Sequence, residues 1–267
     1  MEKKEKMSLA SKVILLLMGI VFLFSIYKLT STYLEYRKGD KEYEELKKEV
    51  VSVETVEIED ADEEEPGNQT VTKTVFKVDF DKLFSINPDT VAWIRFENPE
   101  KISYPVVLGQ DNDKYLKTTF EGNQNSAGAI FADAGASKDF SDRNTFIYGH
   151  NMKNGTMFGQ LRKYKTESFC KENPYFYIYT PEGMEMKYQV FAVCVVENDS
   201  RNYDKMYSDD VEYLEYIQYI RSKSICDIEV DVTAESQIVS LSTCTNVKES
   251  ERLVIHGVKI SEEKVGE

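Results

Sequence analysis

Two residues that could carry nucleophilic chemistry lie eight positions apart near the C-terminus. Cys244 ends an apolar run over residues 237–244, and Arg252 begins a second run over residues 252–256. Two such runs joined by a polar loop predict antiparallel strands, which would bring the cysteine and the arginine close together. A thiolate can attack a carbonyl carbon, and a guanidinium can hold the oxygen of that carbonyl. A lone cysteine is, however, more often a small buried hydrophobic residue than a nucleophile.

The alternation of side chains along the first strand separates two faces. Cys244 shares its face with Ser240 and Ser242, whereas Val239 and Leu241 lie on the opposite face. The cysteine is therefore on the less apolar face of its strand.

A nucleophilic cysteine needs a base, and the chain has two histidines. His150 follows a predicted strand over residues 144–148 and precedes a polar loop, so we expect it to face a groove. His256 lies inside the last strand, on the same side as Arg252. There it is either a hydrogen-bonded core histidine or part of the same cavity. Because a base needs reach and a titratable setting, we predict that His150 is the base.

Short β-type runs separated by turn residues fill the chain after residue 75. Eight strands are predicted, over residues 90–96, 102–108, 127–132, 144–148, 175–180, 184–196, 237–242 and 252–260. A short helix is predicted over residues 79–86, and a longer helix over residues 208–223 has Ser208 as its predicted N-cap. Eight strands in a domain of this length predict a closed barrel or a sandwich.

Composition excludes some classes of protein. The 267 residues carry a formal net charge of −14, which argues against nucleic acid as a partner. The four cysteines form no CxxC pair, so we predict no metal site. Cys194 lies in an apolar run and is expected in the core. Cys170 and Cys226 could form a disulfide, but the sequence does not decide this.

The N-terminal third contains a membrane-anchor pattern. A lysine-rich tail over residues 1–12 precedes an apolar run over residues 13–29, which we interpret as an uncleaved signal anchor because no small-residue cleavage site follows. Lysines and arginines flank both ends, so the charge count leaves the orientation open. Residues 30–74 are predicted to be a linker, with a charged helix that breaks near Gly39 and then a solvated, acidic, extended run.

Several segments together resemble a known family. Residues 240–244 (SLSTC), Arg252 and the upstream residues 148–152 (YGHNM) resemble the signature of the sortases, and class B matches best. The same pattern continues in residues 89–94, 104–107, 111–116, 128–133 and 154–158 and in the helix predicted over 208–223. The similarity spans residues 75–262, the expected catalytic domain, and leaves a short tail over residues 263–267.

The resemblance implies a fold and an activity. The expected fold is mainly β, a closed eight-stranded sortase-type β-barrel with an N-terminal helix and an inserted helix before the cysteine strand. The implied enzyme is a cysteine transpeptidase without a cofactor, with Cys244 as nucleophile, His150 as proton-transfer group and Arg252 as oxyanion clamp. Three further residues match positions at or near the substrate groove of the family, although each also suits ordinary turn or strand structure: Asn112, Leu116 and Thr243.

The resemblance also implies partners and a location. Such an enzyme cleaves a C-terminal sorting signal similar to Asn-Pro-x-Thr after the threonine and transfers the exported protein to an amine of the peptidoglycan cross-bridge. The N-terminus would then be cytoplasmic and the catalytic domain extracellular, with the membrane reached through the N-terminal helix. Three alternatives stay open: a pilin-polymerising sortase, a cysteine endopeptidase, and a membrane-tethered peptide-binding barrel without catalysis.

Two positions depart from the family pattern. Ser240 stands where sortases commonly have threonine, and it keeps a hydroxyl group. Asn246 stands where some class B members have an acid. The sequence therefore offers no acid to orient His150, and a full Cys-His-Asp triad is not predicted.

Overall fold

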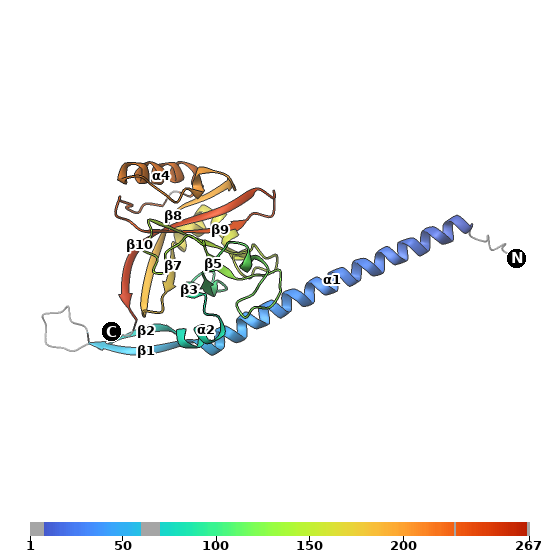
Figure 1. The fold of residues 1–267 in the computed structure, drawn as a ribbon, viewed down its shortest axis with the longest axis horizontal. Coiled ribbons are helices and arrows are strands. Elements are labelled where there is room, and N and C mark those ends of the chain that lie inside the picture. Colours follow the sequence, from blue (N-terminus) through green and yellow to red (C-terminus); the bar gives the residue numbers. More distant parts are fainter. Residues whose placement is uncertain (1–7, 60–69, 227, 266–267) are drawn as a thin grey trace.

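The eight predicted strands pair into one closed barrel (Figure 1). The computed structural model describes residues 8–59, 70–226 and 228–265. Neighbouring strands follow the order β10-β8-β7-β3-β4-β5-β6-β9, which confirms the predicted barrel fold. The strands are β3 (Thr90–Phe96), β4 (Ser103–Val107), β5 (Ile130–Ala132), β6 (Asn144–Tyr148), β7 (Tyr175–Tyr179), β8 (Met184–Glu197), β9 (Ile238–Cys244) and β10 (Glu251–Lys264).

The strand pairing is mixed. β4 with β5 and β6 with β9 are parallel pairs, and the other neighbouring pairs of the barrel are antiparallel. The side chains of Val239 and Leu241 point into the main core, which also holds the fully buried Trp93. The face of β9 that the alternation predicted to be apolar therefore packs into the barrel core, as expected.

Short helices connect the strands. They are α2 (Phe80–Ile86), α3 (Glu167–Glu172), α4 (Asp210–Lys223) and the 3-10 turns η1 (Lys114–Leu116), η2 (Gly159–Lys165) and η3 (Arg201–Tyr203). α4 is the predicted helix before the cysteine strand, and it lies across one end of the barrel in Figure 1. Its N-cap is Asp209 and not Ser208: the Asp209 carboxylate accepts from the Glu212 N–H at 2.9 Å, while the Ser208 N–H donates to the Glu212 side chain.

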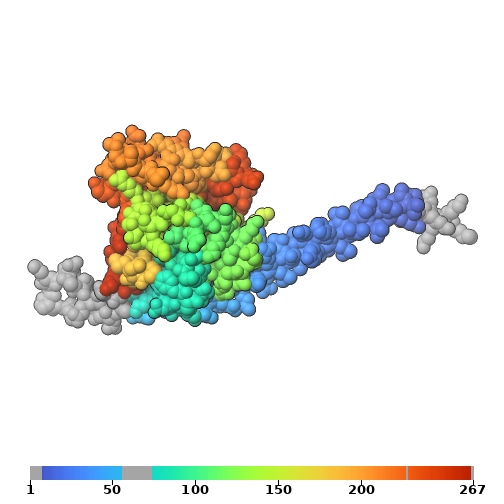
Figure 2. Space-filling view, in the orientation of Figure 1, coloured from blue at the N-terminus to red at the C-terminus, as the bar shows by residue number. Residues whose placement is uncertain are grey.

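The first helix, α1 (Leu9–Val50), is a single helix of 42 residues. Its apolar first half is exposed and projects clear of the globular body (Figure 2). An 18-residue window there has a mean hydropathy of 2.5 with none of it buried, which fits a membrane anchor. The predicted break at Gly39 is wrong. This glycine instead allows the helix to pass Asn125, whose side chain would lie 3.1 Å from an added Cβ.

The second half of α1 docks against the barrel. Tyr43 and Leu46 are buried, and the Tyr43 ring meets the Tyr104 ring edge-to-face at 5.4 Å. The Tyr43 hydroxyl donates to the Gly128 carbonyl at 2.7 Å and accepts from the Phe120 N–H at 3.1 Å. Because the helix is continuous, only about 9 Å separates Leu29, at the end of the apolar run, from Glu35, whose carbonyl and carboxylate accept hydrogen bonds from Asn125 and Ser126 of the barrel domain.

The segment expected to be an extended linker is partly structured. β1 (Val51–Glu59) and β2 (Thr70–Val78) form an antiparallel hairpin in which Val51 pairs with Val78. The prediction of an unpaired, solvated run is therefore wrong for these strands, because both segments are rich in β-branched residues, which favour pairing in a sheet. The acidic residues at 60–65, the tail before residue 8 and residues 266–267 lie outside the described residues.

Two of the four cysteines form a disulfide, and the other two are free thiols. Cys170 of α3 and Cys226 form a disulfide with a Cα–Cα distance of 6.7 Å, which answers the question that the sequence left open. Cys194 and Cys244 are free, and Cys194 is buried as predicted. Cys244 is thus the one free thiol that reaches solvent among the described residues.

We predict that Tyr43→Phe lowers the stability of the docked helix and barrel by about 1–3 kcal/mol, because it removes both hydrogen bonds of a buried hydroxyl. The thermal unfolding midpoint of the full chain in a mild detergent measures this effect. Tyr33→Phe is the matched control, since that side chain is 59 % exposed. Equal midpoints for Tyr43→Phe and the wild type would contradict the docking described above.

Candidate active site

The two strands that flank the cysteine strand β9 carry the other catalytic candidates. Arg252 lies near the start of β10, and His150 lies just after the end of β6. In the antiparallel pair of β9 with β10, Arg252 lies directly opposite Cys244. In the parallel pair of β9 with β6, Tyr148 lies opposite Ser242, so the chain leaves β6 toward His150 alongside the last residues of β9. Sheet pairing alone therefore brings three distant segments of the sequence to one place.

These residues line one cavity of 510 Å³. All six residues predicted from the sequence lie in its wall, and Cys244 is partly exposed there. The lining residues are Asn112, Leu116, Phe131, Asp133, Tyr148, Gly149, His150, Asn198, Tyr203, Lys205, Ser242, Thr243, Cys244 and Arg252. By contrast, burial raises the pKa of the Cys194 thiol to about 11, which keeps it protonated.

Four hydrogen bonds tie the histidine loop to the cysteine strand. The Gly149 N–H donates to the Ser242 carbonyl at 3.2 Å, and the Thr243 hydroxyl donates to the Gly149 carbonyl at 2.7 Å. The Asn151 side-chain amide donates to the Cys244 carbonyl at 2.7 Å. The fourth bond comes from the Asn246 amide, which donates to the Asn151 carbonyl at 2.8 Å. The position of His150 relative to Cys244 is thus fixed by one backbone–backbone bond and three side-chain–backbone bonds.

Glycine is required at position 149. A Cβ there would lie 2.5 Å from Ile130 Cδ1 and 2.8 Å from the Phe158 ring. Both neighbours are fully buried, so neither can move aside at low cost. The glycine therefore lets the strand end pass close to the core immediately before the histidine.

A backbone carbonyl orients the His150 ring. Nε2 of His150 lies 2.7 Å from the carbonyl oxygen of Leu116. Since a carbonyl can only accept, Nε2 carries the proton of this bond, and in the neutral ring Nδ1 is the basic nitrogen. This contact answers what the sequence left open, because the orientation of the ring needs no acid at position 246.

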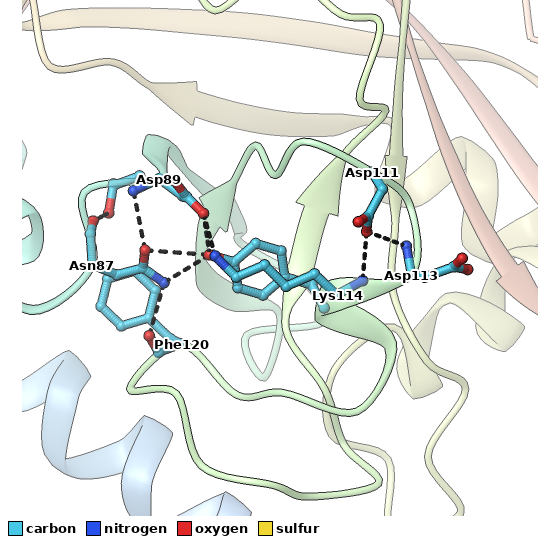
Figure 3. A network of polar contacts seen from close by, with 8 residues as sticks. Asn87, Asp89, Asp111, Asp113, Lys114 and Phe120 are labelled. Atoms are coloured by element: carbon cyan, nitrogen blue, oxygen red, sulfur yellow. Dashed lines mark hydrogen bonds and ion pairs between the residues drawn. The ribbon is translucent and has the colours of Figure 1, made fainter.

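A polar network holds the turn that carries this carbonyl (Figure 3). The Asp111 carboxylate accepts from the Asp113 and Lys114 N–H groups at 2.9 and 2.8 Å, at the start of η1. The Asp89 carboxylate accepts from Lys114 Nζ at 2.6 Å and from the Tyr115 hydroxyl at 2.7 Å. Partial burial would raise the pKa of Asp89, but these two donors outweigh it and lower the pKa, so the anion persists.

The Arg252 side chain is fixed by its own loop. Its Nη1 donates to the backbone carbonyls of Glu249 at 2.6 Å and Glu251 at 3.2 Å. A guanidinium has five N–H donors in a rigid plane, so these bonds hold the plane while other donors remain for a ligand in the cavity.

His256 is fully buried and does not line the cavity. Its Nδ1 lies 2.7 Å from the Ser240 hydroxyl, and its Nε2 lies 3.2 Å from the Asn202 side-chain nitrogen. Burial lowers the pKa of His256 to about 3, so the ring stays neutral. It is the hydrogen-bonded core histidine of the two possibilities that the sequence left open.

The comparisons with known proteins agree with this geometry. The family model described as the sortase domain matches residues 99–260. Sortase B of Listeria monocytogenes is 34 % identical over 177 residues, which are 66 % of this chain and 71 % of the relative. The chain belongs to the class B sortases. Its enzyme class is therefore that of a sortase-type cysteine transpeptidase, as the sequence resemblance implied.

Solved sortase structures share the fold. Sortase B from B. anthracis in complex with AAEK1 has a TM-score of 0.69 and 30 % identity, and the match covers 86 % of this chain and 99 % of that one. A Staphylococcus aureus sortase B–substrate complex has a TM-score of 0.64 and 28 % identity, with 68 % and 84 % covered. The chain therefore has the same barrel fold as the solved class B sortases.

Two residues of the sortase cavity had a predicted binding role but have polar groups that are already engaged. The Asn112 carbonyl oxygen accepts from the Ala134 N–H at 2.8 Å, and its amide donates to Asp133 at 3.1 Å. The Thr243 hydroxyl serves Gly149, as described above. Leu116, in contrast, is 37 % exposed and offers its apolar side chain to the cavity. Of the three, Leu116 is the one that is free to contact a ligand as it stands.

Sequence reasoning missed an ion pair in the cavity wall. The buried Asp133 carboxylate contacts Lys205 and also accepts from the Tyr148 hydroxyl at 3.0 Å. Burial raises the pKa of Asp133, but the bond from Lys205 and its other donors lower it overall. Lys205 and Tyr203 lie between β8 and α4, where no sequence pattern signals a site. Among the described residues, no group of three or more His, Cys, Asp or Glu side chains is placed to hold a metal ion.

We predict that stability falls as pH drops from 6.5 toward 3, because the unfolded state binds a proton at His256 that the folded state does not. One such proton contributes a slope of at most ~1.4 kcal/mol per pH unit. His256→Gln should be less stable at pH 7 but should have a shallower slope between pH 7 and 5, measured by urea unfolding. Identical slopes for the two proteins would show that His256 titrates normally in the fold.

Proposed function

We propose that this sortase cleaves a sorting signal through a thioester on Cys244 and joins the released carboxyl end to an amine. The observation that carries the proposal is the convergence of Cys244, His150 and Arg252 on one cavity through the pairing of β9 with β6 and β10. A thiol, a proton carrier and a fixed cation are the groups that acyl transfer requires.

The first half of the reaction forms the acyl-enzyme. The Cys244 thiolate attacks the carbonyl carbon after the threonine of the signal, and a tetrahedral oxyanion results. The C–N bond then breaks, and protonated His150 donates its proton from Nδ1 to the departing amine. The thioester and a neutral His150 remain.

The second half transfers the acyl group. An incoming amine attacks the thioester carbon and passes its proton to Nδ1 of His150, and the C–S bond breaks to restore the thiolate. Arg252 stabilises the oxyanion in both halves, since its plane is already fixed by the Glu249 and Glu251 carbonyls and needs little reorganisation.

The remaining wall of the cavity would hold the signal. The resemblance to class B members favours an Asn-Pro-x-Thr-like sequence. Leu116 supplies an apolar contact, while Asn112 and Thr243 act by fixing the loops around the ligand, as their hydrogen bonds indicate. A loop residue can thus shape the groove without itself touching the substrate.

The chain would work at a membrane surface. We propose that residues 13–29 of α1 span the membrane, with residues 1–12 in the cytoplasm and the barrel outside, where exported proteins and the wall amine are found. The continuous helix supports a catalytic domain held at short range from the membrane.

Two acceptors are consistent with known class B members. One solved sortase B is complexed with a triglycine peptide (28 % identity, TM-score 0.64), which favours a peptide amine such as that of the wall cross-bridge. A Streptococcus pyogenes class B sortase is described as involved in pilus biogenesis (30 % identity, TM-score 0.62), which keeps a pilin lysine as the second candidate.

We predict that the full chain in detergent cleaves a fluorogenic Asn-Pro-x-Thr peptide and, with an added amine, gives the ligated product by mass. Cys244→Ala should abolish cleavage. His150→Ala should lower the rate by ~10²–10⁴-fold, and Arg252→Gln by ~10²–10³-fold.

His256→Gln is the matched control and should keep most of the activity. Cleavage that survives in Cys244→Ala would refute the proposed nucleophile, and loss in His256→Gln but not in His150→Ala would refute the proposed base. If the donor is only hydrolysed, and no ligated product forms with the added amine, the enzyme is an endopeptidase.

A further inference from the structure

A second cavity lies beside the nucleophile. It has a volume of 450 Å³ and shares Cys244 with the cavity described above. Its other lining residues are Asn151, Lys153, Arg162, Lys165, Thr245, Asn246 and Leu253. Apart from Cys244, the two cavities have no lining residue in common, so the cysteine lies where they meet.

The charge of this second cavity is opposite to that of the chain. Three cations line it and no carboxylate does, although the chain has 47 acidic and 33 basic residues. Lys153, Arg162 and Lys165 are exposed. Within the described part of the chain, no carboxylate lies within salt-bridge distance of any of the three, whereas many other lysines and arginines are paired. Their field is therefore not neutralised locally and acts on whatever enters the cavity.

We propose that this basic cavity binds the acceptor, and that the acceptor is a peptide carrying carboxylate groups near its amine. This inference rests on the proposed function. After cleavage, the acyl chain occupies the first cavity, so the amine must approach the thioester from another side. The basic cavity is such an approach, because Cys244 lies in its wall.

The same cations suit the chemistry of the attack. Only the neutral amine is a nucleophile, and nearby positive charge lowers the pKa of a bound ammonium group. Carboxylates on the acceptor would hold the peptide against Arg162 and Lys165 while the amine loses its proton. The cavity wall also offers a hydrogen-bond acceptor for the amine. The Asn151 Oδ1 is buried and has no donor within the described residues, while the Asn151 amide nitrogen donates to the Cys244 carbonyl.

The experiment compares two acceptors that differ in one charge. The full chain in a mild detergent is given a fluorogenic Asn-Pro-x-Thr donor peptide and either triglycine or triglycinamide, and kcat/KM for ligation is measured for each. We expect triglycine to be preferred by about fivefold at low salt, with the preference falling as ionic strength rises. For each variant, the kcat/KM for triglycine is divided by the kcat/KM for triglycinamide, so a loss that affects both acceptors equally cancels in the ratio.

A triple variant with Lys153→Gln, Arg162→Gln and Lys165→Gln should bring the ratio close to one. Lys163→Gln is the matched control and should keep the preference. Lys163 is an exposed lysine of the same η2 turn, but it lies 5.6 Å from the Phe169 ring centroid and does not line the cavity.

Equal kcat/KM values for the two acceptors in the wild type, ligation to neither, or a preference that survives in the triple variant would overturn the inference. Donor cleavage is read separately by fluorescence. Its absence would refute the proposed function itself, and the acceptor inference with it.

Discussion

The position of β9 in the barrel is the constraint on which the site depends. This strand pairs with β6 on one side and β10 on the other, and the three catalytic candidates lie at the ends of these strands. A register slip of one residue would turn Cys244 into the core and move Arg252 away from it. The buried alternation of Val239 and Leu241 prevents such a slip, so the packing of the core and the geometry of the site have the same cause.

The histidine depends on structure far from the cysteine. Its ring is held by the Leu116 carbonyl, and this turn is held by the Asp89 and Asp111 network. The docked half of α1 contacts the segments that follow: Tyr43 bonds to the loop after Leu116, and Asp40 accepts from the Asn154 amide in the loop after His150. The docked half of α1 thus braces both loops around the histidine.

Sequence reasoning found the elements whose signals are local. Short β-type runs between turn residues located the barrel strands, and the types and order of Cys244, Arg252 and His150 located the site. It failed where tertiary contact decides: Gly39 serves a crossing with Asn125 and not a helix break, and residues 51–59 pair into a hairpin. No local pattern could reveal that a backbone carbonyl orients His150 or that Lys205 pairs with Asp133, because these contacts join segments distant in sequence.

The most direct test of the account is the intact mass of the full chain after mixing with donor peptide in the absence of an amine acceptor and rapid acid quenching. We predict a mass increase equal to the acyl group formed by the N-terminal fragment of the donor, located on Cys244 by peptide mapping and released by hydroxylamine, as expected for a thioester. Donor cleavage without any adduct, or an adduct on a residue other than Cys244, would contradict it.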